Sequence, residues 1–291
     1  MLQPELPMVA VVMPVYQGES YLSGQIESIL GQTYSNIRLY IRDDGSDDAS
    51  LKIIKDYAHN DERILLIQDN RKRLGVTRSI KILLNNVKED VVFFADQDDV
   101  WVPIKIMVML EKIPDNGLGP IPAVVFSDLE VVDESLNQIS GSYWGMSGID
   151  PHRLKFRDII HRNCVTGCAA AVNRAMLKLT RQMPDTAVHD WWIACLSAHS
   201  GVLIPVPEPL VKYRQHGSNV IGAQERGFRR VCKLGKDSLF RDKYMKQLQN
   251  SVVHLKTMLS DFPMEMCFTR KVILSREILR RKLILFFLKL T

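Results

Sequence analysis

The sequence lacks both of the common glycine-rich phosphate loops. No G-x-G-x-x-G follows its first apolar segment, and no G-x-x-x-x-G-K-[ST] occurs anywhere. Dinucleotide oxidoreductases and P-loop enzymes, which use these loops to hold phosphates, therefore lose most of their support. The chain also lacks an uninterrupted apolar run of the roughly 18–20 residues that span a bilayer, and residues 1–7 lack the basic start of a signal peptide.

Cysteine is sparse as well. The five cysteines are odd in number and scattered, which predicts a reducing, cytoplasmic location. Cys164 and Cys168 have no second pair of ligands to complete a zinc site. We therefore expect both to be small buried hydrophobic residues.

Charge divides the chain into two parts. Residues 223–291 contain 16 Lys+Arg and 6 Asp+Glu, whereas the whole chain has a net charge of +5, so residues 1–222 are net negative. We expect an acidic, site-bearing domain at 1–222 and a basic helical C-terminal extension at 223–291.

The end of the extension, residues 270–291, has the pattern of a basic amphipathic helix. Such a helix suits the anionic inner face of the cell membrane. The alternative is a helix that packs on the first domain, or on a second subunit in a homodimer. Binding to nucleic acid is not expected, because the basic stretch lacks a recognised motif and the body of the chain is acidic.

Residues 9–126 alternate between apolar runs and segments of helical periodicity. The expected strands are 9–13, 37–41, 64–67, 91–95 and 123–126, and the expected helices are 21–30, 51–57, 77–86 and 103–113. This alternation predicts βαβ units, and so an α/β fold with a mostly parallel central sheet flanked by helices. We expect Pro14 to end the first strand, and residues 128–149 to form a loop over the site.

Three carboxylates, those of Asp96, Asp98 and Asp99, follow the apolar run 91–95 directly. Such a cluster repels itself unless one pKa rises or a positive charge lies among the oxygens. At the carboxyl end of a buried strand, the occupant expected is a hard divalent cation that holds phosphates, either Mg²⁺ or Mn²⁺. The alternative is a solvated acidic turn that caps the next helix.

The loops that follow parallel strands emerge at one edge of the sheet, so we expect Tyr16, Asp44 and Asp98 to lie near one another. Asp190 and His216 are further candidates. Asp44, at the end of the second strand, can accept hydrogen bonds from a base N–H or a ribose hydroxyl. Asp190 opens a helix, where the dipole favours its ionised form, and is a candidate base; an ordinary N-cap is the alternative. His216, in a polar loop, is either a nitrogen ligand or a surface histidine. Asp48 is expected to cap the helix that begins near residue 49.

Four motifs occur together in one order. They are Pro14-Val15-Tyr16, Asp43-Asp44-Gly45-Ser46 with Asp48, Asp96-Gln97-Asp98-Asp99-Val100-Trp101 and His189-Asp190-Trp191-Trp192. Over residues 9–219 the chain resembles the inverting, nucleotide-sugar-dependent glycosyltransferases of family 2, which have the GT-A fold. With Tyr213-Arg214-Gln215-His216, it is most similar to bacterial rhamnosyltransferases that build O-antigen of lipopolysaccharide or other cell-surface polysaccharide.

The resemblance implies a role for each matching position. Asp98 and His216 would hold the metal, and Asp190 would be the catalytic base that deprotonates the acceptor hydroxyl. The residues implied in donor-nucleotide binding are Pro14, Tyr16, Glu19, Asp44, Arg78, Asp96 and Gln97. For Arg78 the alternative is a solvated helix charge, and for Asp99 a structural role is as well supported as a functional one.

The implied activity is transfer of L-rhamnose from dTDP-β-L-rhamnose to a saccharide acceptor, such as a lipid-linked one, at the inner face of the membrane. Two alternatives remain open at this point. One keeps the chemistry but uses a UDP-sugar, with galactose or N-acetylglucosamine. The other is a non-catalytic scaffold in a polysaccharide-assembly complex.

Overall fold

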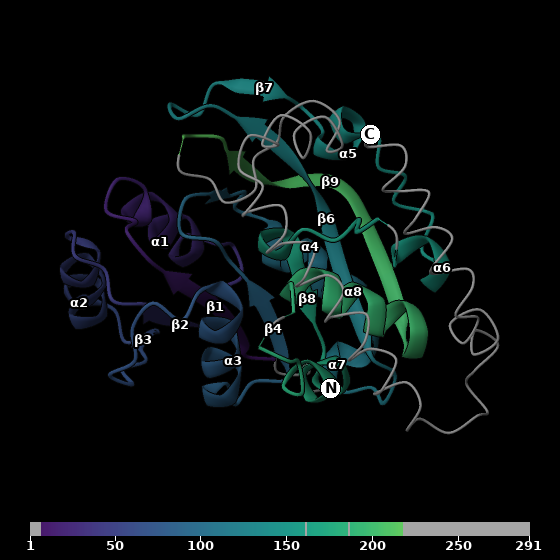
Figure 1. Ribbon diagram of the computed structural model, residues 1–291, viewed down its shortest axis with the longest axis horizontal. Helices are drawn as coiled ribbons and strands as arrows, with labels where there is room; N and C mark the ends of the chain where they lie inside the picture. Colours follow the sequence, from purple (N-terminus) through teal and green to yellow (C-terminus); the bar gives the residue numbers. More distant parts are fainter. Residues whose placement is uncertain (1–6, 161, 186, 218–291) are drawn as a thin grey trace, which may run out of the picture.

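The computed structural model describes residues 7–160, 162–185 and 187–217. Its first half alternates strands and helices (Figure 1). The strands are β1 (Val9–Val15), β2 (Ile37–Asp43), β3 (Ile64–Leu66) and β4 (Val91–Phe94). The helices between them are α1 (Leu22–Leu30), α2 (Ser50–Asn60) and α3 (Val76–Asn86). Each lies within a few residues of its predicted range, so the apolar periodicity located these elements correctly.

The second half is less regular. Its strands are β5 (Val100–Trp101), β6 (Ala123–Val132), β7 (Gln138–Ser140), β8 (Ala170–Val172) and β9 (Val202–Arg214). Its α-helices are α4 (Lys105–Lys112), α5 (Tyr143–Ser147), α6 (Phe156–Ile159), α7 (Arg174–Thr180) and α8 (His189–Ser200). Two 3-10 helices, η1 (Pro114–Gly117) and η2 (Gly167–Ala169), complete the described part of the chain.

The described strands form one mixed sheet in the order β3-β2-β1-β4-β8-β6-β9-β5, with β7 paired to β6. β1 is parallel to both β2 and β4, as the βαβ pattern predicts. β8 is antiparallel to β4 and β6, and β9 is parallel to β6 but antiparallel to β5. The α/β class is confirmed, while the parallel arrangement is continuous only through β3-β2-β1-β4. The short β8 follows a 3-10 turn, and antiparallel pairing needs no crossover helix.

β1 does not end at Pro14 as predicted but continues to Val15. Alternate residues of a strand bond to opposite neighbours. Val12 accepts from Ala95 at 3.0 Å on the β4 side, and Val15 accepts from Asp44 at 2.7 Å on the β2 side. Pro14, two residues after Val12, faces the same neighbouring strand, β4. Since β4 has already ended at this level, the N–H that Pro14 lacks would have had no partner in the sheet.

The region 128–149 is also more ordered than predicted. β6 runs on to Val132, and residues 138–147 contain β7 and α5. The buried Asp128 explains the wrong prediction, because its carboxylate serves this chain rather than solvent. It accepts from the N–H groups of Leu129 at 2.8 Å and Trp144 at 3.0 Å, and from the Ser142 hydroxyl. The register of β6 against β9 shifts at the same residue.

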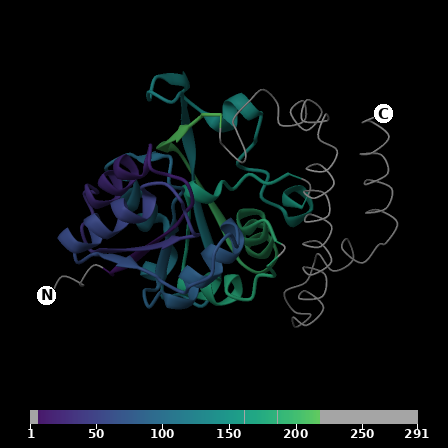
Figure 2. The same ribbon diagram turned by 60° about the vertical axis from the view of Figure 1, so that its left-hand side comes forward.

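Two apolar layers enclose the sheet, because β1 and β4 are buried on both faces. Val9, Val11 and Met13 belong to the layer that includes α1, α2 and α4. Ala10 and Val12 belong to the layer that includes α3, α6, α7 and α8. Figure 2 shows the sheet between these helices. Cys164, Cys168 and Cys195 are buried and free, so the prediction for the first two is confirmed.

The predicted boundary at residue 222, the basic extension and its amphipathic helix lie outside the described residues. Cys232 and Cys267 lie there too. Within the part that the structure describes, no helix is long and apolar enough to cross a membrane.

Candidate active site

Asp98 and His216 lie in contact although 118 residues separate them in the chain. The Nε2 atom of His216 is 2.8 Å from the Oδ2 atom of Asp98. Asp98 belongs to the turn after β4, and His216 follows the end of β9, which reaches the turn because β9 pairs with β5. The His216 ring also lies 4.8 Å from the Tyr21 ring, measured between centroids. The structure thus brings together the two predicted metal ligands.

Arg214 fixes the same turn. Its backbone N–H donates to Asp99 Oδ1 at 3.1 Å, and its Nε donates to the carbonyl of Asp98 at 2.8 Å. The guanidinium lies 4.7 Å from the centroid of the Tyr21 ring. Sequence analysis assigned Arg214 no role, although it lies two residues from His216 in a motif that was recognised.

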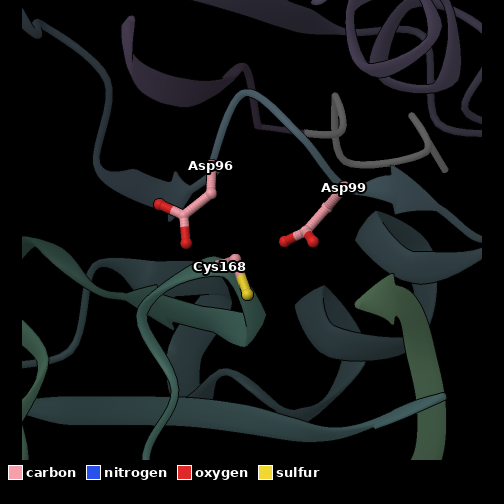
Figure 3. Close-up of side chains that lie close together, drawn as sticks. All are labelled: Asp96, Asp99 and Cys168. Atoms are coloured by element: carbon pink, nitrogen blue, oxygen red, sulfur yellow. The ribbon is translucent and has the colours of Figure 1, made fainter. Parts of the chain in front are cut away.

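A largely buried polar cluster joins the turn to η2. Figure 3 shows Asp96 and Asp99 on one turn, with their carboxylates directed toward Cys168. One ligand atom from each residue lies within 4.8 Å of the others. Burial, followed by the charges of Asp98 and Asp190, raises the pKa of Asp96 to about 7. Burial, with the charges of Asp98 and Asp96, raises the pKa of Asp99 well above its usual range.

Lys105 supplies positive charge to this cluster from the start of α4. It is fully buried, and its Nζ donates to the carbonyl of Cys168 at 2.6 Å and lies 3.4 Å from the centroid of the Trp101 ring. Burial lowers the pKa of Lys105 to about 7, and the charges of Asp99 and Asp96 oppose this. When protonated, Lys105 therefore offsets part of the predicted repulsion between the carboxylates of the turn.

The two sets of candidate ligands differ in their chemistry. Burial raises the pKa of the Cys168 thiol well above its usual value, so Asp96, Asp99 and Cys168 present a protonated, soft sulfur. Asp98 and His216 present a carboxylate oxygen and an imidazole nitrogen, both of which Mn²⁺ accepts. Mg²⁺ and Mn²⁺ fit the second pair, since such ions take their remaining ligands from phosphate and water.

Tyr16 and Gln97 join the loop after β1 to the turn after β4. The N–H of Tyr16 donates to Gln97 Oε1 at 2.7 Å, and Gln97 Nε2 donates to the carbonyl of Tyr16 at 2.9 Å. Tyr16 is 40% exposed, and the Arg73 guanidinium lies 6.0 Å from the centroid of the Tyr16 ring. An exposed ring with a cation over it can bind the face of a nucleobase.

Asp44 lies beside this loop but is largely occupied by the chain itself. Its carboxylate accepts from Arg42 Nη1 at 2.7 Å and from the N–H groups of Leu74 at 2.9 Å and Gly75 at 2.8 Å. Its carbonyl accepts from the N–H of Arg73 at 2.7 Å. Asp44 therefore holds the segment that carries Arg73, and it is only 5% exposed.

We expect Arg42→Met to destabilise the protein strongly. Arg42 is fully buried and donates to Asp44, to Asp69 and to the Ser79 hydroxyl, so its loss leaves a buried carboxylate unpaired. Breaking such a pair costs about 3–5 kcal/mol. Urea unfolding would measure the loss, and Arg38→Met on the same strand provides the control. Only the Arg38 side of its 3.4 Å pair with Glu89 is exposed, and the buried Glu89 keeps its hydrogen bonds from the Tyr40 hydroxyl and the Lys88 N–H in that variant. The loss should therefore be about 1 kcal/mol or less, and equal losses for both variants would contradict this account.

Two other predicted donor contacts, Glu19 and Arg78, have partners within the chain. Glu19 Oε2 accepts from the N–H of Ala49 at 2.8 Å. Asp48 was predicted to cap α2; its Oδ1 accepts from the N–H of Ser50 at 2.9 Å, but the N-cap position is Ala49. Arg78, on α3, pairs with Asp185 at 3.3 Å, and its side chain is half exposed. Pro14 lies within β1, next to the loop that carries Tyr16.

Asp190 lies in the first turn of α8, and its Oδ1 accepts from the N–H of Trp191 at 2.6 Å. Burial raises the pKa of Asp190, and the neighbouring His189 opposes this. The charge of Asp190 contributes to the raised pKa of Asp96. The 3-10 helix η2 lies between the two residues, because Gly167 lies against Asp190 and Cys168 lies beside Asp96. At Gly167 an added Cβ would lie 2.5 Å from His189 Nε2, so a glycine is needed for η2 to approach α8 this closely.

Comparison with known proteins identifies the family of this chain. Residues 10–179 match the protein family described as Glycosyl transferase family 2. The chain belongs to this family. An uncharacterized glycosyltransferase from Haemophilus influenzae is 30% identical over 226 residues, which are 73% of this chain and 67% of that protein. The Escherichia coli protein named UDP-Glc:alpha-D-GlcNAc-diphosphoundecaprenol beta-1,3-glucosyltransferase WfgD is 24% identical, over 73% of this chain and 79% of its own length.

Solved structures confirm a GT-A-like α/β fold for this family 2 glycosyltransferase. S. aureus TarS 1-349 has a TM-score of 0.55 and 15% identity, over 71% of this chain and 60% of that chain. The mannosyltransferase PcManGT from Pyrobaculum calidifontis, solved with GDP-Man and Mn2+, has a TM-score of 0.54 and 15% identity, over 90% of this chain and 78% of its own. This chain thus spans about 60% of the TarS chain that it matches.

Four residues at this candidate site, Arg73, Lys105, Gly167 and Arg214, were not singled out from the sequence. Arg214 lies within a recognised motif, and Lys105 lies close to one. Lys105 follows Trp101 by four residues, and Arg214 precedes His216 by two. Gly167 gave no such signal, since its role depends on how closely η2 approaches α8.

Proposed function

We propose that this glycosyltransferase moves a sugar from a nucleoside diphosphate to the hydroxyl group of a saccharide acceptor, with inversion at the anomeric carbon. The observation that carries the proposal is the pairing of Asp98 with His216 on a turn that lies beside η2, the same element that Asp190 lies against. One group of residues can hold a diphosphate through a metal ion, while another carboxylate can accept a proton across the same site.

Each step has a residue to perform it. The exposed Tyr16 ring and Arg73 would hold the nucleobase, with Asp44 keeping the Arg73 segment in place. Asp96 would accept a hydrogen bond from the ribose or the donor sugar, and Arg78 would leave its exposed pair with Asp185 to approach the diphosphate. Asp98 and His216 would hold Mg²⁺ or Mn²⁺, and such an ion offsets negative charge on a leaving diphosphate.

Asp190 would act as the catalytic base. Its ionised carboxylate takes the proton of the acceptor hydroxyl as that oxygen bonds to the anomeric carbon, and the bond to the diphosphate breaks on the opposite face. Burial raises the pKa of Asp190, which makes its carboxylate a stronger base than a solvated aspartate. A single displacement of this kind inverts the anomeric centre.

The donor is the finer part of the proposal. The Asp96-Gln97-Asp98-Asp99 turn and His216 support dTDP-β-L-rhamnose through the resemblance to rhamnosyltransferases. A UDP-hexose is the second candidate, because WfgD is named for UDP-Glc and one TarS structure contains UDP-GlcNAc. The WfgD name also supports an acceptor linked to a lipid diphosphate.

A donor panel tests the function. The purified full chain would be incubated with Mn²⁺ and dTDP-rhamnose, UDP-glucose, UDP-galactose or UDP-N-acetylglucosamine, with release of nucleoside diphosphate as the readout. We expect release from one donor above all, and its loss with EDTA. Mass spectrometry of any glycosylated acceptor would identify the sugar. Failure of every donor to bind or react would contradict the proposal and would favour the non-catalytic scaffold.

We expect kcat to fall as the pH is lowered through the raised pKa of Asp190. The base works only when ionised, so activity is present above that pKa and is lost below it. The acid limb should therefore lie above the usual aspartate pKa of about 4. A pH profile of kcat at saturating donor and metal would measure this, and a kcat that stays constant down to about pH 4 would contradict the role of Asp190.

A further inference from the structure

Gln97 makes a paired contact with the backbone of Tyr16, 81 residues earlier in the chain. It accepts from the Tyr16 N–H at 2.7 Å and donates to the Tyr16 carbonyl at 2.9 Å. Both functional atoms of the Gln97 amide are thus used to hold the loop after β1. A residue in contact with the donor would be expected to direct at least one of them outward.

The surroundings of Gln97 fit this contact closely. A Cβ added at Gly18 would lie 2.8 Å from both Cδ and Oε1 of Gln97, so the absence of a side chain at Gly18 makes room for the amide. Gln17, between Tyr16 and Gly18, has a φ of 53°, which non-glycine residues seldom adopt without support. The turn itself is held from below, where the buried Gln25 donates to the carbonyl of Asp96 at 2.7 Å.

We infer that Gln97 is a positioning residue, which sets the place of the Tyr16 ring and thereby the affinity for the nucleoside of the donor. This inference rests on the proposed function, since it needs a nucleotide at Tyr16. It also links the two halves of the donor site, because Gln97 is adjacent to Asp98. A single side chain would then fix the position of the loop that holds the base relative to the turn that holds the metal.

The test is calorimetric titration of the full chain with UDP and with dTDP, in the presence of Mn²⁺. Gln97→Leu removes both hydrogen bonds but keeps the side chain similar in size. We expect its Kd for the preferred nucleotide to rise about tenfold, as the loss of two hydrogen bonds that fix the ring would produce. The Kd for Mn²⁺ alone should change by less than about twofold, since Asp98 and His216 are retained.

A double-mutant cycle separates positioning from general damage. Tyr16→Ala should itself weaken nucleotide binding about tenfold, through loss of stacking on the base. If Gln97 acts through Tyr16, Gln97→Leu should add less than about a twofold effect in the Tyr16→Ala background. Additive effects, or an unchanged Kd for Gln97→Leu alone, would overturn the inference.

Two further variants sharpen the result. Gly18→Ala should displace the Gln97 amide and weaken binding in the same way, but should have little further effect when combined with Gln97→Leu. Gln32→Leu is the matched control, because the Gln32 amide also joins separate segments. It donates to the carbonyls of Ser28 and Val102 and accepts from the Ile106 N–H. Gln32→Leu should lower stability without changing the nucleotide Kd; an equal rise in Kd would reduce Gln97 to a structural role.

If the wild-type chain binds neither UDP nor dTDP, both this inference and its nucleotide site are overturned, whereas wild-type binding with no effect of Gln97→Leu overturns the inference alone.

Discussion

Replacing Asp98 with asparagine should lower kcat/KM by at least about 100-fold, because a metal ion at a leaving diphosphate contributes several kcal/mol to the transition state. Asp98 is the carboxylate that contacts His216 at 2.8 Å, and asparagine removes its charge while preserving its shape. The affinity for Mn²⁺ in the presence of nucleotide should fall in parallel. Steady-state kinetics over a series of Mn²⁺ concentrations would measure both.

The control for Asp98→Asn is Asp61→Asn, in which an aspartate paired with Arg63 at 2.7 Å is lost between α2 and β3. This pair is partly exposed, so its loss should cost less than about 1 kcal/mol and leave the Mn²⁺ dependence unchanged. An Asp98→Asn variant that keeps full activity and the same response to Mn²⁺ would remove Asp98 from the metal site. The Asp96, Asp99 and Cys168 cluster would then have to be reconsidered.

Replacing Asp190 with asparagine should lower kcat by about 10²–10⁴-fold, the usual contribution of a positioned base. The donor should still bind with its normal Kd, because the groups assigned to the nucleotide and metal are retained. The asparagine side chain can still accept the hydrogen bond from the Trp191 N–H, so the start of α8 should be preserved. Separate measurement of donor Kd and of kcat distinguishes these effects.

Asp158→Asn is the matched control for Asp190→Asn. Asp158 lies on α6, with a partly exposed side chain whose distance to Arg157 is 3.9 Å. We expect this control to retain the wild-type kcat. Normal turnover in Asp190→Asn would show that another group takes the acceptor proton, and a loss of donor binding in the same variant would mean that Asp190 contributes to the donor site instead.

The sequence predicted the edge of the sheet where the site lies, because β1, β2 and β4 are parallel and their carboxyl ends lie at the same edge. This placed Tyr16, Asp44 and Asp98 near one another with no knowledge of side-chain contacts. The contact between Asp98 and His216 could be predicted only through the resemblance to a known family. Nothing local to either residue indicates that β9 crosses to the turn by pairing with β5.

The internal partners of the site could not be predicted in the same way. The sequence predicted a ligand role for Asp44, whereas three donors, from Arg42, Leu74 and Gly75, show that it also holds the segment that carries Arg73. The roles of Lys105 and Arg214 depend on which groups the tertiary fold leaves buried beside them. Local sequence determines the chemistry of a residue and the helix or strand in which it lies. Its hydrogen-bond and charge partners depend on how distant segments pack across the whole sheet.

The central claim is a single displacement between the diphosphate held at Asp98 and the hydroxyl activated by Asp190. The most direct test is the anomeric configuration of the first product, measured by NMR with the donor that the panel identifies. The account predicts inversion: an α-linked rhamnoside from dTDP-β-L-rhamnose, or a β-linked product from an α-linked UDP-hexose. A product that retains the donor's configuration would contradict it.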